Sequence, residues 1–265
     1  MIFRYLYWRR NLMINKNLNK YANRITNAFL KNKVISPIPS IYTKKISNAQ
    51  KFRKVCESKI LKPIAGFKAA GTGIPVLKKL KEKEPFYATV YKHNVLKNNA
   101  TIKINKYTMG IELEVCYLIK SNFFDFDNKL TKSNVKKFIS HIAPCIEVVG
   151  YRQKKKGIKS LGDLCSDFGA NVKFVIGAKK KFKNNNVNNL KTNISNKKIN
   201  QSVNGNTNTV YINPMNSLLF VLNKLKKDQI RLDANFYVFT GSSVGVVPIL
   251  GKGIYKGIID KIGLV

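Results

Sequence analysis

The segment Gly110-Ile-Glu-Leu-Glu-Val-Cys-Tyr-Leu-Ile119 is the most informative stretch of this chain of 265 residues. Its apolar residues alternate with two glutamates, a pattern typical of a β-strand. Side chains two residues apart in a strand point the same way, so Glu112 and Glu114 are expected on one face, about 7 Å apart. Two such carboxylates repel each other and are costly to bury, whereas a bound cation removes both penalties. The alternative is a solvent-facing edge strand, and this segment by itself favours neither.

A third acid supports the cation interpretation. Glu147 lies in the apolar run Ile142-Ala-Pro-Cys-Ile-Glu-Val-Val-Gly150, which also predicts a strand. The chain has only 13 acidic residues, and solvation explains these three positions poorly. Carboxylate oxygens without histidine are the ligands that hard cations prefer. The sequence therefore predicts that Glu112, Glu114 and Glu147 bind Mg²⁺ or Mn²⁺.

The charge of the chain is strongly basic. It has 49 Lys+Arg against 13 Asp+Glu, a formal net charge of +36, which is typical of nucleic-acid-binding proteins. Base readout relies heavily on arginine, however, and only 7 of the basic residues are Arg, while the lysines are scattered. With 44% hydrophobic residues the chain also has enough apolar surface to fold, unlike a disordered polycation. A nucleic-acid partner is therefore not expected.

The histidines and cysteines exclude or disfavour other chemistries. With only His93 and His141, a His-rich zinc site is excluded and a Ser-His or Cys-His nucleophile is disfavoured. The four cysteines lack Cys-x-x-Cys spacing, which predicts buried free thiols in a reducing cytoplasm. No stretch has the roughly 18 uninterrupted apolar residues that a membrane span needs. The protein is therefore expected to be cytoplasmic, with no membrane contact.

Residues 1–20 are expected to be an N-terminal extension of the catalytic domain. Residues 1–12 are basic and faintly similar to a transit peptide, although Met13 as the true start is an alternative. Residues 21–265 are expected to form one catalytic domain, helical to about residue 85 and mainly β after it. The class predicted is α+β.

Further elements follow from the spacing of apolar and capping residues. Helices are expected over residues 18–31, from an N-cap at Ser47 to before Pro63, over 133–141, and from Asn213-Pro214 to about Lys227. Strands are expected over residues 86–91, 101–104, 109–119, 142–150, 172–177, 236–240 and 254–259. The Lys/Asn-rich residues 179–208 are expected to form a long hairpin or surface segment.

Several motifs resemble one family in their order and spacing. They are Glu112-Leu-Glu114, Glu147, Ser166-Asp-Phe-Gly-Ala-Asn171, Phe174-Val-Ile-Gly177, Gly66-Phe-Lys68, Glu84-Pro85, Asn213-Pro214 through Asn223, and Phe239-Thr-Gly-Ser242. Together they resemble the fumarylacetoacetate hydrolase superfamily, in the branch of 2-keto-4-pentenoate (2-hydroxypenta-2,4-dienoate) hydratases and 2-oxo-3-hexenedioate decarboxylases. The likeness runs from about Tyr21 to Val265, and it implies a mixed β-roll core with N-terminal helices, in homo-oligomers.

The resemblance also implies roles for individual residues. The three glutamates match the metal ligands. Lys68 matches a lysine near the substrate and is expected to be catalytic, by moving a proton or holding the anionic substrate. Four further residues match positions that line the pocket or follow the third ligand: Asp167, as a catalytic residue, and Arg152, Asn171 and Thr240, as substrate-binding residues. The implied activity is that of a hydro-lyase, the metal-dependent hydration of a 2-hydroxy-2,4-dienoate to a 4-hydroxy-2-oxo acid.

The chain departs from the family pattern after Glu84-Pro85, where many hydratases carry an acid and this chain has Phe86. Metal binding and enolisation do not need that acid, whereas the hydration step would lose a proton-transfer partner with it. Decarboxylation of a 2-oxo acid therefore stays an alternative, as does C–C hydrolysis on the same fold. A noncatalytic Lys-rich protein that binds anions or nucleic acid is the alternative of a different class.

Overall fold

Two long antiparallel strands form the centre of the fold. The computed structural model describes residues 16–154 and 158–265, so the expectations for residues 1–12 lie outside the described part. Strand β4 (Thr108–Ile119) pairs with β5 (Ile139–Gly150), and Glu112 lies directly opposite Glu147 in this register. The odd-numbered apolar residues of β4, Ile111, Leu113 and Val115, are buried as predicted.

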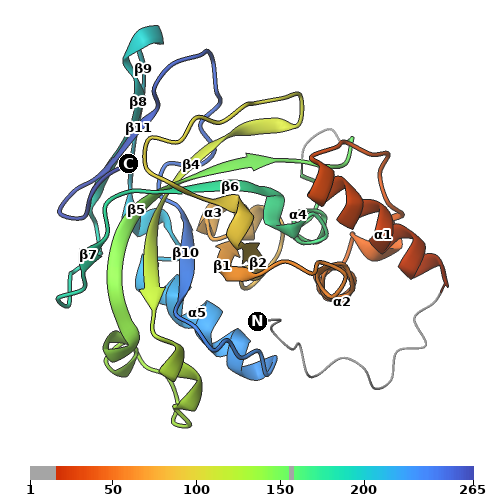
Figure 1. Ribbon diagram of the computed structural model, residues 1–265, viewed down its shortest axis with the longest axis horizontal. Helices are drawn as coiled ribbons and strands as arrows, with labels where there is room; N and C mark the ends of the chain where they lie inside the picture. Colours follow the sequence, from red (N-terminus) through yellow and green to blue (C-terminus); the bar gives the residue numbers. More distant parts are fainter. Residues whose placement is uncertain (1–15, 155–157) are drawn as a thin grey trace.

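The remaining strands extend this pair into a curved mixed sheet (Figure 1). The strand order is β2-β1-β10-β4-β5-β6-β3, with β7 paired to β5. The pairs β1/β10 and β3/β6 are parallel, and the other pairs of this sheet are antiparallel. The added strands are β1 (Ile64–Ala70), β2 (Phe86–Tyr91), β3 (Val95–Lys97), β6 (Asn171–Ile176), β7 (Lys180–Lys181) and β10 (Phe236–Ser242).

A second, antiparallel sheet of four strands has the order β12-β11-β8-β9. Strands β8 (Lys191–Asn196) and β9 (Gln201–Asn206) form the hairpin expected from the Lys/Asn-rich segment. Strands β11 (Lys256–Ile259) and β12 (Gly263–Leu264) complete it at the C-terminal end of the chain. Figure 1 shows this sheet at one end of the molecule, on the far side of β4 and β5 from the N-terminal helices.

The N-terminal helices pack together beside the main sheet (Figure 1). Helix α1 (Lys16–Lys31) contacts α2 (Ile46–Glu57), which contacts the short α4 (Leu161–Cys165). The apolar face of α1 is buried at Ala22, Ile25, Ala28 and Phe29, which have the spacing of an amphipathic helix. Along the chain, the short α3 (Ile74–Lys79) connects β1 to β2.

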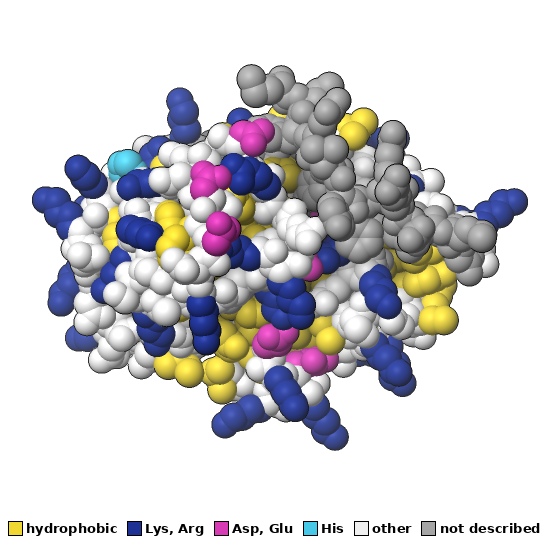
Figure 2. Space-filling view, turned by 90° about the horizontal axis from the view of Figure 1, so that it is seen from below, with side chains coloured by type: hydrophobic (Ala, Val, Ile, Leu, Met, Phe, Trp, Pro, Cys, Tyr) yellow, Lys and Arg dark blue, Asp and Glu magenta, His cyan; other side chains and the backbone are white. Residues whose placement is uncertain are grey.

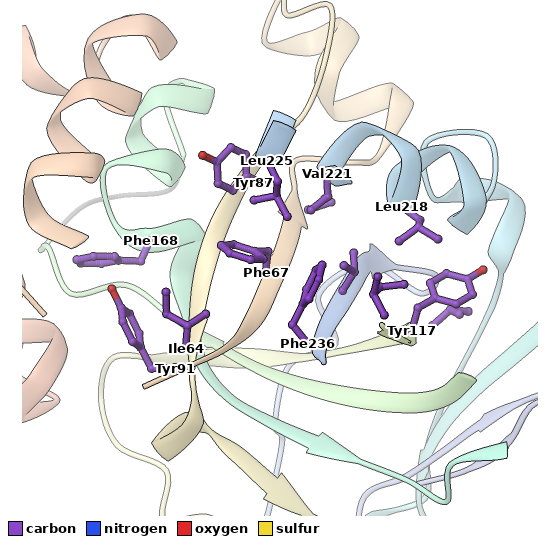
Figure 3. Close-up of a cluster of buried hydrophobic side chains, with 14 of the residues drawn as sticks. Ile64, Phe67, Tyr87, Tyr91, Tyr117, Phe168, Leu218, Val221, Leu225 and Phe236 are labelled. Carbon is purple, nitrogen blue, oxygen red and sulfur yellow. The ribbon is translucent and has the colours of Figure 1, made fainter. Parts of the chain in front are cut away.

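Helix α5 (Pro214–Lys227) covers the face of β1, β2 and β10. Its first residue is the predicted Pro214, and the side chain of the N-cap Asn213 accepts a hydrogen bond from Asn216 N at 3.1 Å. Figure 3 shows its residues Leu218, Val221 and Leu225 over the aromatic rings of the sheet. Each such buried aliphatic side chain contributes roughly 1.5–3 kcal/mol of hydrophobic stabilisation.

Three predictions about local structure are wrong. Residues 101–104 form no strand, and residues 133–141 form a 3₁₀-helix (Asn134–Phe138) that runs into β5. The spacing of Val135, Phe138 and Ile142 imitates a helix, but pairing with β4 takes residues from Ile139 on into the sheet. Helix α2 begins at Ile46, and its N-cap is Lys45, without a side-chain hydrogen bond, in place of Ser47.

The basic side chains are spread over the described part of the face that Figure 2 shows. In the face shown in Figure 2, Lys and Arg side chains project in many directions and do not gather in one stripe. Among the described residues, no helix is both long enough and apolar enough to cross a lipid bilayer. The four cysteines are buried free thiols, as the sequence predicts.

Candidate metal centre and active site

Three glutamates converge on the inner face of the curved sheet. Glu112 and Glu114 share one face of β4, and Glu147 comes from the neighbouring β5. Each offers a carboxylate oxygen, and these oxygens all lie within 4.8 Å of one another. Glu114 and Glu147 have no exposed surface, and Glu112 is partly buried. The predicted cluster is therefore present, and it is not the solvent-facing side of an edge strand.

Burial dominates the electrostatics of the cluster. It raises the pKa of Glu112 and of Glu114 to about 7, and that of Glu147 to about 8. Each glutamate also raises the pKa of a neighbour, while Lys68 lowers all three. Burial would lower the pKa of Lys68, but the glutamates, Glu147 foremost, raise it above its usual value. The lysine is therefore charged beside the carboxylates.

Lys68 reaches the cluster from β1. Its Nζ lies 2.5 Å from Glu147 Oε1 and 2.6 Å from Oε2, and it donates to the carbonyl oxygen of Gly169 at 3.2 Å. In the strand order, β1 lies three places from β5. In a flat sheet the backbones of these two strands would be about 14 Å apart, too far for the Lys68 and Glu147 side chains to meet. The contact exists because the sheet curves and brings its inner face together.

The charges of the cluster fit a divalent cation. With all three carboxyls ionised, one ammonium leaves two negative charges in a buried site, and the raised pKa values show that this charge needs compensation. Glu114 Oε2 accepts a hydrogen bond from Gly241 N at 3.0 Å, whereas Oε1 has no hydrogen-bond partner within the described ranges. An all-oxygen donor set of this kind suits Mg²⁺ or Mn²⁺. Gly241 was not predicted as a site residue, although it lies in the Phe239-Thr-Gly-Ser242 motif.

The turn that follows Asp167 lies against Lys68. Phe168, Gly169 and Ala170 all have positive φ angles, of 54°, 70° and 58°. For the two residues with a Cβ, this left-handed conformation costs about 1–2 kcal/mol each. Such local strain persists only where the surroundings over-determine the backbone, and it is enriched at functional sites.

Arg152 and Asp167 form a buried ion pair at this turn. Arg152 Nη1 lies 2.9 Å from Asp167 Oδ1, and Arg152 N donates to Asp167 Oδ2 at 2.7 Å. The guanidinium also donates to the carbonyl oxygens of Asp167, at 3.2 Å, and of Asn171. Its side chain is 1% exposed. Arg152 therefore has several partners within the protein, and its expected contact with a substrate stays a prediction.

The side chains of Asn171 and Thr240, the other two predicted substrate-binding residues, also donate hydrogen bonds to backbone carbonyl oxygens. Asn171 Nδ2 donates to the carbonyl oxygen of Phe168 at 2.8 Å, while its Oδ1 has no partner in the part of the chain that is described. Thr240 Oγ1 donates to the carbonyl oxygen of Val115 at 2.8 Å, which ties β10 to β4. Asn171 therefore retains a free acceptor, whereas the Thr240 hydroxyl is used by the sheet.

Two aromatic residues lie in or beside segments that the family resemblance covers: Phe86, where many hydratases have an acid, and Tyr151, just before Arg152. Phe86, in place of the acid, is 1% exposed and packs in an apolar cluster with Ala70 and Leu161. Tyr151 follows β5, and its hydroxyl is buried without a hydrogen-bond partner among the residues described. Burial, and then the carboxylates of Asp167, Asp163 and Glu112, raise the pKa of Tyr151. Of these carboxylates, Glu112 belongs to the cluster, so its charge acts on Tyr151, a residue for which the sequence predicted no role.

The comparisons with known proteins agree with this architecture. No family model matches the chain, and no curated protein matches it in sequence. Among solved structures, it is similar to 4-oxalocrotonate decarboxylase from Pseudomonas putida G7, with a TM-score of 0.82 and 16% identity over 96% of this chain and 98% of that one. That enzyme was solved with calcium and acetate, and with magnesium and adipate.

More distant similarities point the same way. The 5-carboxymethyl-2-hydroxymuconate delta-isomerase from Mycobacterium smegmatis has a TM-score of 0.52 and 12% identity, over 77% of this chain and 76% of that one. A protein from Yersinia pestis CO92 that is described as of the fumarylacetoacetate hydrolase family has a TM-score of 0.53 and 12% identity, over 77% of this chain and 94% of that one. The predicted fold is confirmed: this chain has the α+β fold of the fumarylacetoacetate hydrolase superfamily.

Proposed function

We propose that this protein is a divalent-metal-dependent lyase that acts on a small unsaturated 2-oxo acid. The observation that carries the proposal is the buried cluster of Glu112, Glu114 and Glu147 with Lys68 beside it. A Mg²⁺ or Mn²⁺ ion held by these glutamates would act as a Lewis acid that stabilises the enolate of such a substrate. The resemblance in fold to 4-oxalocrotonate decarboxylase supports the same chemistry.

Lys68 is the residue placed to handle the substrate's charge and proton. Its ammonium is buried and reaches the cluster without solvent between it and Glu147. In that position it can hold an anionic substrate group, and it can deliver a proton to the enolate. The neighbouring Gly169 carbonyl limits how far the ammonium can move.

Decarboxylation is the reaction that we favour. In 2-oxo-3-hexenedioate, the bond to the distal carboxyl carbon breaks, CO₂ leaves, and the electron pair passes through the double bond to the 2-oxo oxygen. Protonation of the resulting dienolate gives 2-hydroxypenta-2,4-dienoate, so atoms and charge balance. This reaction needs an electron sink and one proton, and it does not need the acid that Phe86 replaces.

Hydration of a 2-hydroxy-2,4-dienoate is the second candidate. It uses the same enolate, but the buried apolar ring of Phe86 leaves that position without a proton donor or acceptor. C–C hydrolysis has less support, because neither histidine belongs to the cluster. His93 packs against Phe29 and Tyr91, and His141 lies on β5 opposite Leu118.

The experiment is a turnover assay with Mn²⁺ or Mg²⁺ and two substrates. With 2-oxo-3-hexenedioate as substrate, we expect release of CO₂. If the protein instead consumes 2-hydroxypenta-2,4-dienoate without releasing CO₂, it is a hydratase. Glu114→Gln should abolish either turnover. Glu57→Gln is the matched control, because it removes a buried carboxylate that pairs with Arg53 outside the cluster. Turnover by Glu114→Gln at the wild-type rate would overturn the proposal.

The expected partners are also open to direct tests. Assembly as a homo-oligomer stays a prediction, to be measured by size-exclusion chromatography with light scattering. A noncatalytic protein that binds nucleic acid through its lysines would instead show steeply salt-dependent binding to generic DNA, with no metal requirement. We expect no such binding near physiological salt.

A further inference from the structure

The left-handed turn Phe168–Ala170 lies against the Lys68 side chain at Gly169. The Gly169 carbonyl oxygen accepts a hydrogen bond from Nζ, and a Cβ added to Gly169 would lie 3.5 Å from Lys68 Cδ and 3.3 Å from Ala70 Cβ. The turn therefore forms one wall of the space in which the lysine lies. A shift of this turn would therefore shift the Lys68 ammonium that is bonded to it.

Arg152 joins the two ends of this turn. Its guanidinium donates to the carbonyl oxygen of Asp167, just before the turn, and to that of Asn171, just after it. Both contacts use the planar fork of one side chain, which holds the two carbonyls at a set separation. Such a clamp is what a segment of three consecutive left-handed residues needs to persist.

Helix α1 packs against Arg152 and the turn through Phe29. The ring of Phe29 lies 4.7 Å from the Arg152 guanidinium carbon and 4.5 Å from the ring of Phe168. Phe29 thus contacts both the arginine and the first residue of the turn. A helix far from the glutamates in sequence is in this way connected to the lysine beside them.

We propose that Arg152 is a positioning residue, which acts through the Phe168–Ala170 turn to hold Lys68 against Glu147, and that Phe29 of α1 supports it. Arg152 itself touches none of the three glutamates among its hydrogen bonds. The placement of Lys68 follows from these contacts. Only its consequence for turnover rests on the proposed function.

The test measures the placement of Lys68 directly. Native protein is treated with acetic anhydride, and acetylation of the Lys68 peptide is followed by mass spectrometry. In the wild type Lys68 should react slowly, since it is buried and bonded. Arg152→Gln, which removes the charged fork, should raise the rate of Lys68 acetylation at least about tenfold.

Arg53→Gln is the matched control. Arg53 is also 1% exposed, pairs with Glu57 at 2.6 Å and lies 4.8 Å from the Tyr87 ring centroid. In the described part of the chain, no hydrogen bond, ion pair or ring contact joins it to residues 168–170. It should lose stability without raising Lys68 acetylation. Equal acetylation rates in Arg152→Gln and Arg53→Gln would overturn the proposal, because the effect would then reflect general destabilisation.

A second pair of variants covers the case in which Arg152→Gln does not fold. Phe29→Leu should raise Lys68 acetylation severalfold, whereas Phe52→Leu, at a buried ring of α2 stacked on Tyr42, should not. No difference between these two would overturn the role of Phe29 and of the clamp. In turnover, Arg152→Gln should lower kcat more than it raises KM. A protein without lyase activity that still shows the acetylation pattern would refute the proposed function alone.

Discussion

Metal binding and the stability of the fold are linked at the glutamate cluster. Without metal, the three buried carboxylates face one ammonium, so Glu114→Gln removes one repelling charge and we expect it to raise the unfolding temperature of the metal-free protein. With Mn²⁺ at a hundredfold excess over its Kd, the wild type should gain about 2.7 kcal/mol. For 265 residues, at about 2.1 cal/mol/K of unfolding entropy each, this corresponds to about 5 °C in Tm.

The assay is differential scanning fluorimetry with and without Mn²⁺, checked by calorimetric titration. Glu114→Gln should lose most of the shift, while Glu57→Gln should keep it despite a lower starting Tm. The control is expected to be less stable because it leaves the buried Arg53 without its carboxylate, a loss of about 3–5 kcal/mol. A full 5 °C gain in Glu114→Gln would refute the assignment of the cluster as the metal site.

Three further predictions concern the fold around the site. Gly66→Ala should prevent soluble expression or the native circular dichroism spectrum, because the new Cβ would overlap the Tyr237 carbonyl oxygen where β1 and β10 pair. Burial by itself would raise the pKa of Asp228, but hydrogen bonds from Tyr87 and Lys54 lower it below the usual value. Its contribution to stability is therefore present at neutral pH and should be lost as pH falls below about 4, so urea titrations of wild type and Asp228→Asn should converge in acid. The buried thiols should react with Ellman's reagent only on unfolding, and rapid reaction in the native protein would contradict their burial.

The local patterns of the sequence predict the central elements well. Alternation in residues 109–119 predicts β4, and the Asn213-Pro214 start with leucines three or four residues apart predicts α5. The same rules fail at residues 133–141, where helical spacing gives way to pairing with β4, since long-range strand pairing overrides local preference. Strand β1 was not predicted, because its residues show no alternation: all seven are buried.

The sequence by itself determines the chemistry of the site. Acids two residues apart in one strand and a third in the next apolar run predict an oxygen-ligand metal site, because alternation places them on one face. Only the tertiary structure decides what surrounds them. The curvature of the sheet brings Lys68 of β1 to Glu147, three places away in the strand order. The fold also brings the Arg152 guanidinium to the carbonyl oxygens on both sides of the left-handed turn after Asp167. Both depend on the path of the chain in space, which spacing along the sequence does not encode.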